Sequence, residues 1–201
     1  MRVYLDCFPC FLRQTLEAVR FVTPDEKIHE KVVRQVLELV ASLDARRTPP
    51  AIGQQIHRVI RQMTGNADPY RQRKQDSNRL AMELYPQLKA RIQCSPHPLE
   101  TAVQLAIAGN VMDFGLYPAL ARSDVMQAVD SALADGWDTT CLPEFMQAVH
   151  EARAILYLGD NAGEIVFDRL LIETLRHPKV TFVVKGAPVL NDATREDAER
   201  A

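Results

Sequence analysis

The sequence predicts an α+β or α/β protein, in which a helical domain over residues 1–151 precedes the start of a parallel βαβ domain over residues 152–201. Two observations predict this fold class. Apolar residues recur at helical spacing through the first 150 residues, whereas short β-rich runs occupy 154–158 and 180–184. A segment with helical periodicity separates those runs, and strands joined through a helix pair in parallel.

Composition and charge indicate an ordinary globular protein. The chain has 201 residues, of which 47% are hydrophobic and 25% charged, so it can bury a sizeable core. A net charge of −2 and a pI near 6.2 do not favour a general binder of nucleic acid or of membrane surfaces. No apolar run reaches the roughly 18 residues of a membrane span, and the amino terminus has no apolar signal core. We therefore expect a cytoplasmic protein.

Start and stop signals divide the amino-terminal part into helices. Thr23 is expected to cap one helix, with Pro24 at its first position, and Gly65 is expected to end another. A more polar helix should end or kink near Pro86. The expected helices begin after the CFPC turn and near Thr23, Thr48, Asp68, Leu99, Ser123 and Pro143.

Polar side chains follow the first expected strand directly. Residues 154–158 end on Gly159, and Asp160 and Asn161 come next, before a helical pattern that begins at Gly163. In open α/β sheets, ligands bind beyond the carboxyl ends of the strands, where the amino terminus of the following helix attracts anions. A phosphate group would suit this position.

The second strand should deliver further polar residues to the same edge. In a parallel pair, the segment from Lys185 to Asp192 emerges beside Asp160 and Asn161. Two carboxylates and an amide oxygen form an all-oxygen ligand set, which favours Mg²⁺ or Mn²⁺ over thiophilic metals. The sequence thus predicts a metal site at Asp160, Asn161 and Asp192.

Each of these residues also has a simpler interpretation. Asp160 and Asn161 could form a turn and helix cap, and Asp192 could cap the last helix. Glu164 could lie near the phosphate or could merely compensate the helix dipole. Lys185 could offset phosphate charge or could be an exposed lysine at a strand end.

Other polar residues carry weaker signals. In the GNVMDFG stretch, Asn110 and Asp113 are flanked by apolar residues and glycine, which suggests a buried polar loop, with a structural turn as the alternative. Cys7 and Cys10 match half of a zinc site that Cys94 or Cys141 could complete; a redox pair or plain reduced thiols remain the alternatives. The five histidines have no paired spacing, so each is expected at the surface.

Five motifs together resemble a known family. In chain order they are CFPC, DPYRQRKQDSN, AIAGNVMDFG, GDNAGE and VKGAPVLNDAT. This set resembles the metal-dependent damage-control phosphatases, formerly domain of unknown function 89, in the branch with an amino-terminal CxxC. The resemblance implies a helical domain on a Rossmann-like α/β domain. It also implies hydrolysis of small phosphometabolites such as sugar phosphates with Mn²⁺, Co²⁺, Ni²⁺ or Mg²⁺.

The resemblance also assigns residues. An Asp and Asn after the first strand and an Asp after the second hold the metal in such proteins, and these positions are Asp160, Asn161 and Asp192. Asn110 and Asp113 would form a wall of the substrate pocket. Three residues of the polar helix could reach the same pocket, although their pattern alone is typical of a solvated helix face: Lys74, Ser77 and Asn78.

We expect the chain to be carboxy-terminally truncated. Family members run on through further strands and a later lysine that helps to bind phosphate. A helix start at 191–194 also comes only a few residues before Ala201, and two parallel strands make a poor sheet alone.

Phosphomonoester hydrolysis is therefore the expected reaction, with a small phosphorylated metabolite as partner. The metal would activate a water, while the N–H groups of 162–164, Gly163 among them, and Lys185 would stabilise the phosphoryl oxygens. One alternative is an S-adenosylmethionine-dependent carboxyl methyltransferase or another nucleotide-binding enzyme, although GDNAGE lacks the GxGxxG spacing. An inactive helical interaction module is the other.

Overall fold

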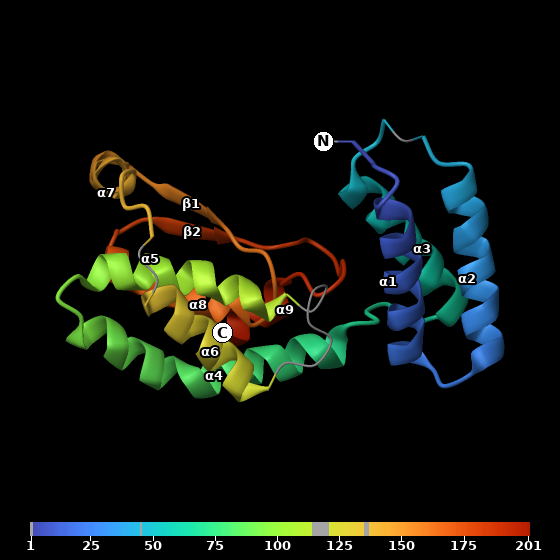
Figure 1. Ribbon diagram of the computed structural model, residues 1–201, viewed down its shortest axis with the longest axis horizontal. Helices are drawn as coiled ribbons and strands as arrows, with labels where there is room; N and C mark the ends of the chain where they lie inside the picture. The colour runs from blue at the N-terminus through green and yellow to red at the C-terminus, as the bar shows by residue number, and fades with distance from the viewer. Residues whose placement is uncertain (1, 45, 114–120, 135–136) are drawn as a thin grey trace. The chain divides into compact units, whose positions relative to one another are not determined.

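The computed structural model describes residues 2–44, 46–113, 121–134 and 137–201 (Figure 1). Contacts within the chain divide it into two compact units. Unit 1 consists of residues 1–72 with 188–190, and unit 2 of residues 73–187 with 191–201. The predicted boundary near residue 152 marks the change from helices to strands, and the division by contacts falls elsewhere.

Unit 1 is a group of three amphipathic helices, α1 (Cys7–Val22), α2 (Glu26–Ala41) and α3 (Pro49–Thr64), each packed on the other two (Figure 1). Each helix turns one apolar stripe inward, because residues three and four apart share a face. The shared core contains Val19, Val32, Val36, Ile52, Ile56 and Ile60.

The helix boundaries of unit 1 confirm some signals and correct others. Thr48 is the N-cap of α3, and Gly65 ends α3 in the left-handed conformation with φ of 69°. The cap of α2 is Asp25, whose carboxylate accepts from the Lys27 N–H at 2.9 Å, so the assignment of Thr23 is wrong. Thr23 instead ends α1, since its N–H donates to the Val19 carbonyl. The CFPC segment forms the first turn of α1 rather than a turn before it.

A buried histidine lies in unit 1, contrary to the expectation of surface positions. His57 is 2% exposed and lies against Tyr70, with ring centroids 5.7 Å apart. Burial, with a smaller contribution from Arg61, lowers its pKa to about 4. Histidine spacing in the sequence carries no information about such burial.

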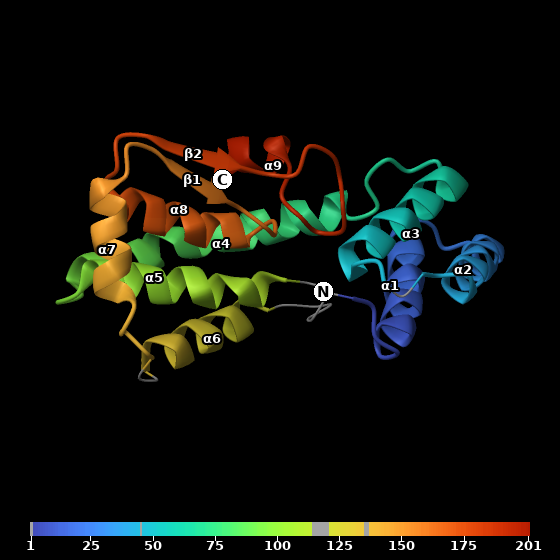
Figure 2. The same cartoon turned by 90° about the horizontal axis from the view of Figure 1, so that it is seen from above.

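Unit 2 holds the remaining elements in layers (Figure 2). Helix α5 (Pro98–Ala108) packs against α8 (Glu164–Leu175) and α6 (Arg122–Ala134). The buried core of unit 2 includes Leu84, Leu88, Leu105, Met112, Val125, Phe167 and Leu170. The other elements of this part of the chain are α4 (Arg71–Cys94), a 3₁₀ turn η1 (Gly109–Met112), α7 (Leu142–Glu151) and α9 (Arg195–Arg200).

Helix α4 does not end at its proline. It continues through Pro86 to Cys94, although proline removes one intrahelical hydrogen bond. Leu84 and Leu88, on either side of Pro86, are fully buried. Burial of this face stabilises the helix beyond the point at which local propensity favours an end.

The predicted βαβ unit is confirmed. Strands β1 (Ile155–Leu158) and β2 (Val180–Val183) pair in parallel, with Ile155 opposite Val180 and Leu158 opposite Val183. Helix α8 connects them and lies on one face of the sheet (Figures 1 and 2). Within the described residues, none of the helices combines the length and the apolar character needed to cross a bilayer.

The tight packing of η1 on α8 leaves no room for a side chain at Gly109. A methyl group on Gly109 would lie 2.8 Å from Phe167 Cβ, which is fixed to the α8 backbone and cannot move aside. We expect Gly109→Ala to lower the free energy of unfolding by about 1–3 kcal/mol. Gly53→Ala is the control, because nothing lies within 4 Å of the added methyl group. That change inside α3 should stabilise by about 0.5–1 kcal/mol. Calorimetric unfolding of both variants tests this, and equal effects would contradict it.

Candidate active site

Backbone hydrogen bonds join the first loop, residues 159–163 after β1, to the second loop, residues 184–194 after β2. Asn161 and Asp192 form an antiparallel bridge. The Ala162 N–H donates to the Asn191 carbonyl at 2.9 Å, and the Ala193 N–H donates to the Asp160 carbonyl at 2.6 Å. The two segments that carry the predicted metal ligands are therefore held beside one another.

The Asp160 and Asp192 carboxylates both lie close to the ammonium group of Lys185. Lys185 Nζ lies 3.4 Å from Asp160 Oδ1 and 3.3 Å from Asp192 Oδ2. The side chain of Asp160 is 58% exposed and that of Asp192 is 14% exposed, so the site opens on the Asp160 side. The structure brings Asp160, Asp192 and Lys185 together at the position where one cation can meet both carboxylates.

The side chain of Asn161 is buried beside these carboxylates and is held by two acceptors. Its Nδ2 donates to Glu164 Oε2 at 2.8 Å and to Asp160 Oδ2 at 3.3 Å. Because the nitrogen is engaged, Oδ1 is the Asn161 atom that could ligate a cation. Glu164, the first residue of α8, thus orients the amide from the opposite side.

Negative charge accumulates at this edge of the sheet. Burial raises the pKa of Asp192, and the nearby Asp160 and Asp113 raise it further, which outweighs the opposing effect of Lys185. Burial likewise raises the pKa of Glu164, with contributions from Asp160 and Asp113. Carboxylates that resist ionisation together are stabilised by a nearby cation. The oxygen donors present fit a hard divalent ion.

Asp113 and Asn110 differ in their relation to the site. The Asp113 carboxylate accepts from Asn191 Nδ2 at 3.2 Å and is half-buried, so it lies at the second loop. Asn110 is exposed in η1, where its carbonyl accepts from the Asp113 N–H, so the expectation of a buried polar residue at Asn110 is wrong. The rest of the GNVMDFG motif, residues 114–115, lies outside the described residues.

Gly163 shapes the first loop. Its φ is 85°, and an added Cβ would lie 2.8 Å from Met112 Cε and 2.9 Å from Ser77 Cβ. Its N–H donates to Asn78 Oδ1 at 2.7 Å, and the Ala162 N–H is also paired. The expectation that these two N–H groups bind phosphate does not hold in this structure, because both have partners within the protein.

The polar residues of α4 are buried. Lys74, Ser77 and Asn78 are 3%, 1% and 7% exposed, so the interpretation as a solvated helix face is wrong. The Ser77 hydroxyl is the one buried side-chain polar atom without a hydrogen-bond partner among the described residues. Sequence periodicity could not distinguish this face from a solvated one, because both present polar residues at helical spacing.

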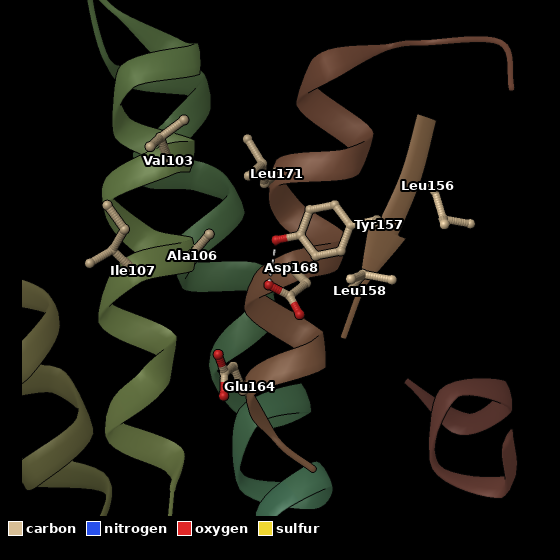
Figure 3. A pocket seen from close by; sticks show the side chains of 9 residues that line it. All are labelled: Val103, Ala106, Ile107, Leu156, Tyr157, Leu158, Glu164, Asp168 and Leu171. Carbon is tan, nitrogen blue, oxygen red and sulfur yellow. Dashed lines mark hydrogen bonds between the residues drawn. The ribbon is translucent and has the colours of Figure 1, made fainter. Parts of the chain in front are cut away.

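A pocket of about 390 Å³ lies beside the site, between α5, β1 and α8 (Figure 3). The hydroxyl of Tyr157 points into it and donates to Asp168 Oδ1 at 2.6 Å. Glu164, the residue that holds Asn161, also lines this pocket. Tyr157 and Asp168 were not predicted from the sequence, although an Asp within the apolar stripe of a helix was a signal. The apolar lining residues are Val103, Ala106, Ile107, Leu156, Leu158 and Leu171.

Cysteine provides no second metal centre among the described residues. All four cysteines are free thiols, with Cys7 and Cys10 half-buried at the start of α1. No group of three or more His, Cys, Asp or Glu side chains close enough to hold a metal occurs in the described ranges. The candidate metal site depends on Asn161 together with two carboxylates, and the zinc interpretation of Cys7 and Cys10 has no further ligand in this part of the chain.

Known proteins share this sequence pattern and fold. The damage-control phosphatase ARMT1-like domain matches residues 3–201. The chain belongs to this family. A damage-control phosphatase of Pyrococcus horikoshii is 32% identical over 205 residues, covering 100% of this chain and 70% of that protein. A damage-control phosphatase of Archaeoglobus fulgidus is 30% identical over 208 residues, with coverage of 100% and 70%.

A solved structure has the same fold. The crystal structure of a DUF89 family protein from Pyrococcus horikoshii superposes with a TM-score of 0.84 at 31% sequence identity, covering 100% of this chain and 70% of that one. The α+β architecture is therefore that of the damage-control phosphatase family, and the resemblance found in the motifs is confirmed.

The ionisation of Asp168 in the pocket should make the stability of the protein depend on pH. Burial raises the pKa of Asp168 to about 7, with Glu164 and Asp160 adding to the effect and the Tyr157 hydrogen bond opposing it. The pKa of Asp168 is therefore higher in the folded than in the unfolded protein. This carboxyl group stabilises the fold fully below its unfolded pKa, and the contribution is lost as the pH rises from there through about 7. Asp168→Asn keeps an acceptor for Tyr157 without the charge. We expect it to be more stable than the wild type at pH 8, by up to about 4 kcal/mol.

Chemical denaturation of both proteins from pH 4.5 to pH 8 measures this difference. The advantage of Asp168→Asn should shrink as the pH falls, because the wild-type carboxyl group then becomes neutral. A difference in stability that is the same at every pH would contradict the assignment.

Proposed function

We propose that this chain is a metal-dependent phosphatase that hydrolyses small phosphorylated metabolites such as sugar phosphates. The observation that carries the proposal is the convergence of Asp160 and Asp192 on one cation position, beside Asn161, in a member of the damage-control phosphatase family. The relatives named above are damage-control phosphatases, and the α+β fold is shared with one of them.

Asp160, Asn161 and Asp192 would hold the divalent ion, which we expect to be Mn²⁺, Co²⁺, Ni²⁺ or Mg²⁺. When bound, such an ion polarises a phosphoryl oxygen and lowers the pKa of a water molecule. Glu164 keeps the Asn161 amide in one orientation through the Nδ2 hydrogen bond. A donor group that is fixed in advance does not have to be reordered during the reaction.

Lys185 would compensate the charge of the phosphate. Its ammonium already lies at the junction of the two loops, and its side chain is 44% exposed, so it can turn toward a ligand in the opening. Burial lowers its pKa, but Asp192 and Asp160 raise it more, so the net direction is upward and Lys185 stays charged at neutral pH. An ammonium group donates to phosphoryl oxygens as a compact point charge.

The remaining predicted residues would contact the substrate or its surroundings. Asp113 lies at the second loop, and Asn110 is exposed two residues before the buried Met112. We propose that Asp113 and Asn110 border the substrate, and that Gly163 acts through the shape of the first loop.

Loss of a metal ligand should remove activity without unfolding the protein. Asp160 is exposed, so Asp160→Ala leaves no buried cavity, and we expect phosphatase activity with Mn²⁺ to fall by about 100-fold or more. Asp130→Asn is the matched control, because it removes one exposed carboxylate from an ion pair with Arg91. The measurement is phosphate release from a panel of sugar phosphates, with and without each metal.

The outcomes of this assay separate the alternatives. Activity that survives EDTA treatment, or that is equal in Asp160→Ala and the wild type, would refute the metal-dependent proposal. Binding of S-adenosylmethionine without any phosphate release would instead support the methyltransferase alternative.

A further inference from the structure

A buried polar cluster lies beneath the two loops of the candidate site. It consists of Lys74 and Asn78 on α4 and Asp197 on α9, which are 3%, 7% and 6% exposed. Lys74 Nζ lies 3.1 Å from Asp197 Oδ2, and Asn78 Nδ2 donates to Asp197 Oδ1 at 3.0 Å. We call these residues the buried network. None of them is a predicted metal ligand.

The buried network reaches the first loop through Asn78. Its Oδ1 accepts from the Gly163 N–H at 2.7 Å, while its Nδ2 donates to Asp197, so both ends of one amide are engaged. Gly163 is two residues beyond Asn161. Since Gly163 has no Cβ, its backbone lies directly against α4 at Ser77.

The buried network reaches the second loop through Asp197. Its Oδ2 accepts from the Thr194 N–H at 2.9 Å and from Thr194 Oγ1 at 2.7 Å. The Asp197 N–H in turn donates to the Thr194 side chain, which completes the capping box of α9. Thr194 is two residues beyond Asp192. A continuous chain of hydrogen bonds therefore runs from Gly163 through Asn78 and Asp197 to Thr194.

We propose that Asn78 and Asp197 are positioning residues that hold the two ligand-bearing loops in the arrangement that binds the metal. This inference rests on the proposed function and deepens it. A buried polar network favours one arrangement, because a shift of either loop leaves a donor or acceptor without a partner. The backbone bridge joins the loops to each other, and the buried network fixes both of them to α4.

Variants of the buried network test this inference. Asn78→Ala removes both the amide nitrogen that donates to Asp197 and the amide oxygen that accepts from Gly163. Asp197→Asn removes the charge that faces Lys74 with little change of shape. Glu199→Gln is the matched control, since Glu199 lies on the same helix and pairs with Arg195 in an exposed ion pair. The readouts are hydrogen exchange of segments 159–164 and 190–195, followed by mass spectrometry, and Mn²⁺ affinity from calorimetry on the full chain.

We expect Asn78→Ala and Asp197→Asn to speed exchange in both segments and to weaken Mn²⁺ binding by about 10- to 100-fold, whereas Glu199→Gln should change neither. A milder variant covers the case in which the first two do not fold. Thr194→Val removes the hydroxyl that donates to Asp197 Oδ2 and accepts from the Asp197 N–H, and it should speed exchange in 190–195 while leaving 159–164 unchanged.

Exchange that stays at the wild-type rate in both segments, or that rises evenly across the chain with Mn²⁺ affinity unchanged, would overturn the positioning role. The exchange measurement needs no metal, so it decides this inference even if the wild-type chain binds no Mn²⁺. A wild-type chain that binds no Mn²⁺ would refute the proposed function separately.

Discussion

The parallel pairing of β1 with β2 is the constraint on which the candidate site depends. Because Leu158 lies opposite Val183, both strands leave the sheet at the same edge, and the loops that follow can pair through Asn161 and Asp192. In an antiparallel pair, the segments that follow the two strands would lie at opposite ends of the sheet. The side chains of the two loops would then share no space, whatever their chemistry.

This geometry concentrates carboxylates in a small volume. Burial and the negative charges of Asp160 and Asp113 raise the pKa of Asp192, and Lys185 compensates only part of this effect. Glu164 faces both the candidate site, through Asn161, and the neighbouring pocket that contains Asp168. Such an arrangement is stable in the ionised form only when positive charge lies close by. The same property would make the site selective for a cation over neutral ligands.

The sequence predicted the elements whose signals are local. The βαβ unit follows from β-rich runs around a segment with helical periodicity. Asp160 and Asn161 follow from their position directly after the first strand, and Asp192 from the expectation that the segment after the second strand emerges at the same edge. Asp25 and Pro86 show the limit of this reasoning: neighbouring caps compete, and buried leucines keep a helix intact through a proline. Burial of Lys74 and Asn78 could not be predicted, since their partner Asp197 lies more than a hundred residues further along the chain. The pairing of Tyr157 with Asp168 depends in the same way on how a strand packs against a helix.

The position of a bound Mn²⁺ ion would show whether Asp160, Asn161 and Asp192 form one metal site. A crystal of this chain grown with Mn²⁺ can be measured at a wavelength at which manganese scatters anomalously. We predict one anomalous peak coordinated by the side-chain oxygens of Asp160, Asn161 and Asp192. A peak elsewhere in the molecule, or none at a saturating concentration of Mn²⁺, would contradict it.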